Sequence, residues 1–262
     1  MEKKGFFVFK KTYNKEEFVR LYADSYYLDK GTVGQVAPNA SGSRWFIEDM
    51  MDSILSHGIT CKLDIIHILS WKMSKFIQSN DRSDLVYAKD WAKLQSVDED
   101  GIDESLFIKR YGKSFEIGKI AVSVYHNLSQ LEEAAKLSWQ ALLKKLDALI
   151  GNFYGLGPVY LITLMYFISR GKYPIYDQFA MMALTAIHEG VTPGGQIPYK
   201  GLPSVKELLE NDDPDFGYQR YIDLLNDTFS EEELFRDGVP CRDVDRVNPP
   251  FFKTLCPFLE NA

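Results

Sequence analysis

The sequence predicts an all-α protein, on three observations. Apolar residues recur at the spacing of a helix face in most segments of the chain. Residues that commonly cap helices precede several of these segments, and glycines such as Gly58 and Gly190 follow them. The helical spacing also continues on both sides of the tight turn Gly155–Pro158. We therefore expect two helices to meet at that turn.

In the N-terminal part, Asn14 can cap a first helix, and residues 44–56 form a second that ends at Gly58. Thr60 can cap a third, whose apolar stripe runs from Ile65 to Phe76. The polar segment 79–105 is expected to hold one or two short helices. Two helices are expected at 118–128 and 130–149, and a third leaves the turn with its apolar pattern at Leu161, Leu164, Met165 and Ile168. A helix that follows Asp177 and ends at Gly190, a loop at 191–203, a helix near 215–228 and a capping box Ser230-x-x-Glu233 are expected after it.

Composition indicates a globular protein. The chain has 262 residues and only three cysteines, Cys61, Cys241 and Cys256, which are widely spaced. A reduced, cytoplasmic protein is the simplest interpretation. No signal peptide is recognised at the N-terminus, and no apolar segment is long enough to span a membrane. The scattered histidines form no metal-binding pattern, so neither a metal nor another cofactor is expected.

The net charge of −7 argues against non-specific binding of nucleic acid, but the acidity is local. Residues 203–262 contain 14 acidic and 6 basic residues, and residues 1–202 contain 23 and 24. A short basic cluster, Lys109, Arg110, Lys113 and Lys119, contains one acid, Glu116. Such a cluster can contact phosphates. A solvated helix end or loop is the commoner meaning of a charge run.

The turn Gly155-Leu156-Gly157-Pro158 is the most informative local motif. Glycine allows a ligand to approach the backbone closely and permits positive φ. Proline suits the first turn of the helix that follows, where free N–H groups can hold a phosphate. The alternative is a packing corner without a binding role.

Asp177 follows the turn at the start of another apolar helix. A carboxylate near C1′ of a nucleotide can stabilise the positive charge that develops when an N-glycosidic bond breaks, or can activate water. The alternative is a plain N-cap, because aspartate is a preferred capping residue.

Over about residues 137–187 the chain resembles the helix-hairpin-helix DNA glycosylases, and Tyr173-Pro-Ile-Tyr-Asp177 brings it nearest to the 8-oxoguanine glycosylase-like branch. The resemblance implies two helical domains with a cleft between them, residues 59–170 and residues 1–58 with 171–262. It implies DNA-phosphate contacts at Gly155, Leu156, Gly157 and Val159, and a catalytic Asp177. Val159 stands where bifunctional members carry a lysine, so a base-excision-repair hydrolase of this kind would be monofunctional.

Aromatic residues surround the motif, and Phe153, Tyr154, Tyr173 and Tyr176 are candidates to stack on an extruded base. Core packing is the commoner role of such residues. Two functions therefore remain open. One is a DNA glycosylase that hydrolyses the bond to a damaged or modified base. The other is a non-catalytic helix-hairpin-helix protein that binds nucleic acid or a partner protein.

Overall fold

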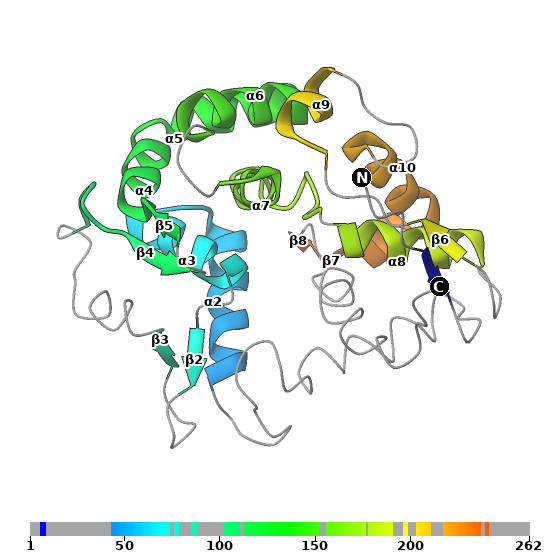
Figure 1. Ribbon diagram of the computed structural model, residues 1–262, viewed down its shortest axis with the longest axis horizontal. Coiled ribbons are helices and arrows are strands. Elements are labelled where there is room, and N and C mark those ends of the chain that lie inside the picture. The colour runs from blue at the N-terminus through cyan, green and yellow to red at the C-terminus, as the bar shows by residue number, and fades with distance from the viewer. Residues whose placement is uncertain are drawn as a thin grey trace. The chain divides into compact units, whose positions relative to one another are not determined.

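The computed structural model describes residues 6–8, 43–73, 76–78, 85–87, 102–110, 113–151, 156–176, 178–190, 196–198, 203–210, 217–236 and 239–240. Helices make up most of this part of the chain, as predicted (Figure 1). Contacts divide the chain into two compact units, residues 30–174 and residues 1–29 with 175–262. The domain boundaries that the resemblance implies, with a first domain at 59–170, stay a prediction.

The unit of residues 30–174 holds six helices among its described residues. Its elements are α2 (Ser43–His57), α3 (Lys62–Met73), β2 (Phe76–Gln78), β3 (Leu85–Tyr87), β4 (Ile108–Arg110), β5 (Lys113–Phe115), α4 (Ile117–His126), α5 (Leu128–Leu137), α6 (Trp139–Ile150) and α7 (Pro158–Ile168). The strands form two antiparallel pairs, β2 with β3 and β4 with β5.

Helix α7 is the core of this unit. Every residue from Leu161 to Ile168 is buried, and the helix packs against α3, α5 and α6 (Figure 1). A helix that is apolar all round is stable only when its neighbours cover it. The buried hydroxyl of Thr163 is satisfied locally, since Oγ1 donates to Val159 O over 2.7 Å.

The C-terminus of α7 forms a Schellman motif. Arg170 N donates to Phe167 O over 3.1 Å, and Gly171 N donates to Tyr166 O over 2.7 Å. Arg170 occupies the left-handed position, with φ 52°, where glycine is usual. Its side chain continues outward, and Nη2 donates to His57 O at the end of α2 over 3.2 Å.

The two residues after Gly171, Lys172 and Tyr173, form hydrogen bonds with the C-terminal turn of α5. Lys172 Nζ and Tyr173 Oη both donate to Ala135 O in the last turn of α5, over 3.3 and 2.9 Å. Cations and donors near a helix C-terminus satisfy carbonyls that have no partner within the helix. The segment Arg170–Tyr173 therefore links the ends of α2, α5 and α7.

The second unit is described as a smaller set of elements. These are β1 (Phe6–Val8), α8 (Gln178–Glu189), β6 (Gln196–Pro198), α9 (Val205–Glu210), α10 (Tyr218–Thr228), α11 (Glu231–Leu234), β7 (Phe235–Arg236) and β8 (Val239–Pro240). Helix α8 packs against α10, and β1 pairs with β6 and β7 with β8, both antiparallel. The expected first helix, capped by Asn14, lies outside the described residues.

Several predicted elements differ from the structure. The single helix expected at 130–149 is two helices, because Ser138 is extended and its Oγ accepts a hydrogen bond from Ala141 N, which starts α6. The stripe that was expected to reach Phe76 ends with α3 at Met73, and Phe76 lies in β2. Residues 85–87 are a strand inside the segment that was expected to hold one or two short helices, and β6 lies inside the expected loop. Helix α9, with a capping box between Ser204 and Glu207, was not predicted.

His67 in α3 gives the stability of the chain a dependence on pH. Burial lowers the pKa of its imidazole to about 4, although the nearby Asp64 carboxylate opposes this shift. The folded chain therefore keeps His67 neutral while the unfolded chain protonates it near its ordinary pKa, and stability falls as the pH drops between these two values. We expect a loss of about 2 kcal/mol between about pH 7.5 and about pH 5 from this group. Urea unfolding of His67→Gln at both pH values checks this.

The matched control is His126→Gln, since His126 is exposed at the end of α4. The control is expected to retain the pH dependence of the original chain, and His67→Gln to lose most of it. Equal pH dependence in all three chains would contradict the assignment.

Candidate nucleic-acid interface

The candidate interface is centred on the first turn of α7, which follows α6 in the chain. The two helices pack against each other, and residues 152–155 of the connection lie outside the described residues. Gly157 is the N-cap of α7 and Pro158 is its first residue. Among the described residues, no side chain caps this end of the helix. Its backbone N–H groups and the positive end of the helix dipole are therefore suited to an anion.

Of the two reasons expected for glycine at position 157, positive φ and close approach of a ligand, the structure excludes the first. Its φ is −103° and its ψ is 175°, an extended conformation that any residue can adopt, so positive φ is not required there. None of the described atoms lies within 4 Å of the position that a Cβ would take. As far as the described residues go, the space beside Gly157 is open, and the absence of a side chain lets a ligand approach the backbone closely.

The other predicted contact residues are only partly described. Leu156 and Val159 are half-buried beside Gly157. Asp177, Gly155, Phe153 and Tyr154 lie outside the described residues, so their predicted roles stay predictions.

Tyr173 and Tyr176 are both buried, which is the packing role that was the alternative to base stacking. Tyr173 is 6% exposed, and its hydroxyl donates to α5 as described above. Tyr176 is 1% exposed, and its ring lies 5.8 Å from that of Tyr218 and 5.1 Å from that of Tyr221. A nucleobase would have to displace these neighbours in order to stack. The structure therefore argues against both residues as stacking platforms.

Lys172 is the described lysine that follows α7 most closely in the chain, and it has a structural role. Its Nζ donates to Ala135 O and lies 5.0 Å from the centre of the Tyr173 ring. An amine that forms a Schiff base must be available to the sugar C1′, whereas this one closes the end of α5.

Three residues of the basic cluster, Lys109, Arg110 and Lys113, lie in a β-hairpin that was not predicted, and Lys119 lies in α4. Strands β4 and β5 pair with Lys109 opposite Ser114 and Arg110 opposite Lys113. The signal for this hairpin is weak but present, because two short segments flank the two residues Tyr111-Gly112. The buried ring of Phe115 in β5 lies 6.3 Å from that of Tyr160 in the first turn of α7, so the hairpin base and the candidate interface are neighbours.

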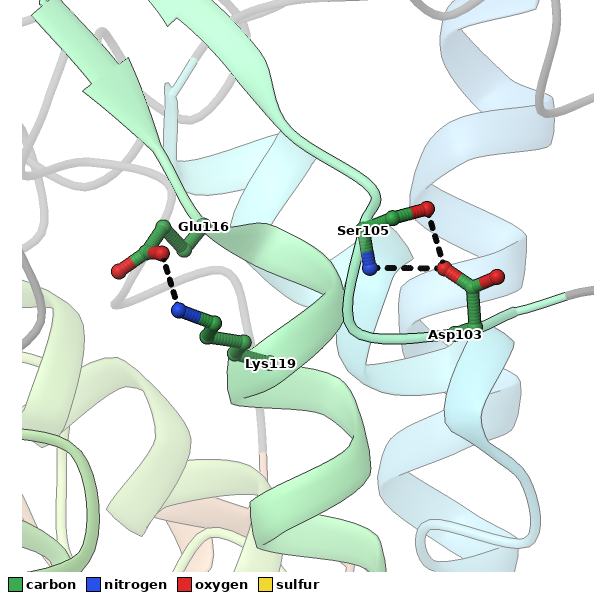
Figure 2. A network of polar contacts seen from close by, with 4 residues as sticks. All are labelled: Asp103, Ser105, Glu116 and Lys119. Atoms are coloured by element: carbon green, nitrogen blue, oxygen red, sulfur yellow. Dashed lines mark hydrogen bonds and ion pairs between the residues drawn. The ribbon is translucent and has the colours of Figure 1, made fainter.

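The turn before the hairpin and the helix after it contain two polar contacts (Figure 2). Asp103 Oδ1 accepts hydrogen bonds from Ser105 N and Oγ, over 2.7 and 2.5 Å, and these lower the pKa of the Asp103 carboxyl. Lys119 Nζ pairs with Glu116 Oε1, and this bond raises the pKa of the Lys119 ammonium. Glu116, the acid of the basic cluster, is thus partnered by Lys119.

Within the described ranges, no group of three or more His, Cys, Asp or Glu residues is placed to hold a metal ion. None of the helices in that part of the chain is long and apolar enough to cross a membrane. Comparison of the chain with protein-family models, with curated proteins and with solved structures gave no match.

Proposed function

We propose that this protein binds DNA through the first turn of α7 and hydrolyses the N-glycosidic bond of a damaged or modified base. The observation that carries the binding part is the N-terminal end of α7, where no described side chain caps the helix and no described atom lies within 4 Å of the position that a Cβ of Gly157 would take. The resemblance to helix-hairpin-helix glycosylases supplies the reaction.

The distribution of charge supports the proposal. Residues 105–174, which run from the basic hairpin to the end of the α7 corner, contain nine basic and four acidic residues. The rest of the chain is acidic, since residues 30–104 contain eight basic and 12 acidic residues, and residues 1–29 and 175–262 together contain 13 basic and 21 acidic residues. A DNA backbone is therefore attracted to residues 105–174, although the net charge of the whole chain is negative.

In the proposed reaction, the N–H groups at the start of α7 hold a phosphate of the strand that carries the target base. The Asp177 carboxylate then stabilises positive charge on the sugar as the bond to the base breaks, and water completes the hydrolysis. Val159 supplies no amine, so the reaction ends at an intact abasic strand.

Binding is tested with Gly157→Thr. Threonine is β-branched but caps a helix about as well as glycine, and its side chain meets none of the described atoms within 4 Å at its Cβ. The variant is therefore expected to fold normally and to bind duplex DNA about tenfold more weakly, because its side chain blocks approach of a phosphate to the backbone, an interaction worth about 1.4 kcal/mol. Fluorescence anisotropy at low salt measures the affinity.

An original chain that shows no DNA binding at low salt would remove the proposal altogether. Unchanged affinity in Gly157→Thr would remove the role of α7. The reaction is tested by incubation with oligonucleotides that carry different damaged bases, followed by alkali, which reveals abasic sites as strand breaks.

A second function, a non-catalytic protein that binds nucleic acid or a protein partner, is favoured by one observation. The described aromatic candidates Tyr173 and Tyr176 are packed in the interior and do not offer a stacking surface for an extruded base. DNA binding that depends on Gly157, without release of any base in the oligonucleotide assay, would select this function.

A further inference from the structure

The β4–β5 hairpin is the most strongly charged short element near the first turn of α7. Residues 105–115 contain three basic residues, Lys109, Arg110 and Lys113, and no acidic one. The nearest acid on the C-terminal side, Glu116, is partnered by Lys119. Asp103 and Glu104 come directly before this segment, so the positive charge is unbalanced only within residues 105–115 themselves.

The base of the hairpin is fixed to the helices beneath it. Lys62 Nζ in α3 donates to Ile102 O over 2.9 Å, and Gly118 N in α4 donates to Leu106 O over 2.9 Å. On the C-terminal strand of the hairpin base, Phe115 is buried, and its ring meets Tyr160 edge to face. These contacts hold the hairpin base beside the start of α7 (Figure 1).

The register places the charged positions. Alternate residues of a strand lie on the same face, and directly paired residues share a face. Arg110 and Lys113 are paired with each other and lie two positions along from the Ile108–Phe115 pair. Arg110 and Lys113 are thus on the same face of the hairpin as Phe115 but nearer to its turn. The Lys109–Ser114 pair is on the opposite face.

We infer that the β4–β5 hairpin is a second contact element for the DNA backbone, which binds phosphates next to the one held by α7. This inference rests on the proposed function and adds a surface to it. Cations on both faces of a narrow hairpin suit phosphates of the polyanionic backbone and carry no information about base sequence. The hairpin therefore raises the affinity for DNA and the dependence of that affinity on salt, without selecting a base sequence.

The test compares two triple variants that remove equal charge. The first is Lys109→Gln, Arg110→Gln and Lys113→Gln in the hairpin. The control is Lys136→Gln, Lys206→Gln and Arg220→Gln, at exposed positions in α5, α9 and α10. Binding of an undamaged duplex oligonucleotide is measured by anisotropy over a range of salt concentrations, and circular dichroism verifies that each variant is folded.

If all three cations contact phosphates, the slope of log affinity against log salt is expected to become shallower by about 2 to 3 in the hairpin variant. Its affinity at about 0.1 M salt is expected to fall at least about tenfold below that of the control variant. The same slope and affinity in the two triple variants would overturn the inference.

The Gly157→Thr variant separates this inference from the proposed function. If DNA binding is lost in Gly157→Thr but retained in the hairpin variant, the proposed role of the hairpin is wrong and the proposed function stands. Binding lost in the hairpin variant but retained in Gly157→Thr supports the hairpin and overturns the role of α7. No binding by the original chain overturns both.

Discussion

Gly118→Ala is expected to lower the free energy of unfolding by about 3 kcal/mol, at the upper end of what an added methyl group does in a packed site. A Cβ at this position would lie 2.0 Å from Asp103 O and 2.9 Å from Leu106 Cβ. Neither neighbour can move easily. Gly118 N donates to Leu106 O, and Asp103 is held by its bonds to Ser105 (Figure 2). Thermal and urea unfolding measure the effect.

The matched control is Gly157→Ala, the same change where none of the described atoms lies within 4 Å of the new Cβ. We expect that variant to remain within about 1 kcal/mol of the original chain, since only the N-cap preference changes. Equal stability of the two alanine variants would show that the turn at residues 102–106 does not press against α4 in solution.

Asp177→Asn is expected to lower base excision by about 100-fold or more, because electrostatic stabilisation of this kind is typically worth about 3 kcal/mol. DNA affinity is expected to remain nearly unchanged, since in this proposal the phosphate contacts come from α7 and the hairpin. Single-turnover excision on the best substrate from the oligonucleotide assay gives the rate. The control is Asp227→Asn, which neutralises an exposed carboxylate in α10.

Full activity of Asp177→Asn would return this residue to a plain capping role. The same assay tests the expected monofunctional chemistry. Strand cleavage by β-elimination passes through an imine between an amine and C1′, and borohydride traps this imine as a covalent complex. Val159 provides no amine, and Lys172 closes the end of α5. No trapped complex is therefore expected, and efficient trapping would contradict this mechanism.

The helices could be predicted where local signals agree with packing. The end of α2 was predicted from Gly58, which has φ 87° and whose N donates to Ile54 O over 2.8 Å. The start of α7 was predicted from Pro158, because proline requires no N–H partner at that position. Such signals depend on a few consecutive residues, and tertiary contacts do not override them here.

The remaining features have only weak local signals or depend on residues that are distant in sequence. Strands of two or three residues are too short for an alternating pattern to be recognised. The break between α5 and α6 at Ser138 interrupts a continuous apolar spacing, so periodicity alone does not reveal it. The packing of Tyr176 with Tyr218 and Tyr221, and the proximity of the hairpin to α7, come from pairs that lie about forty residues apart. A single sequence contains no local signal for such pairs.

The corner at Arg170–Tyr173 has a consequence for the dynamics of the unit of residues 30–174. Its donors reach His57 O and Ala135 O, so the last turns of α2 and α5 are both held by the chain that leaves α7. We therefore expect opening of that short corner to release both helix ends in one event. In a hydrogen-exchange measurement, amide protons in those two turns, far apart in sequence, are then expected to exchange with solvent at a common rate, as members of one cooperative unit.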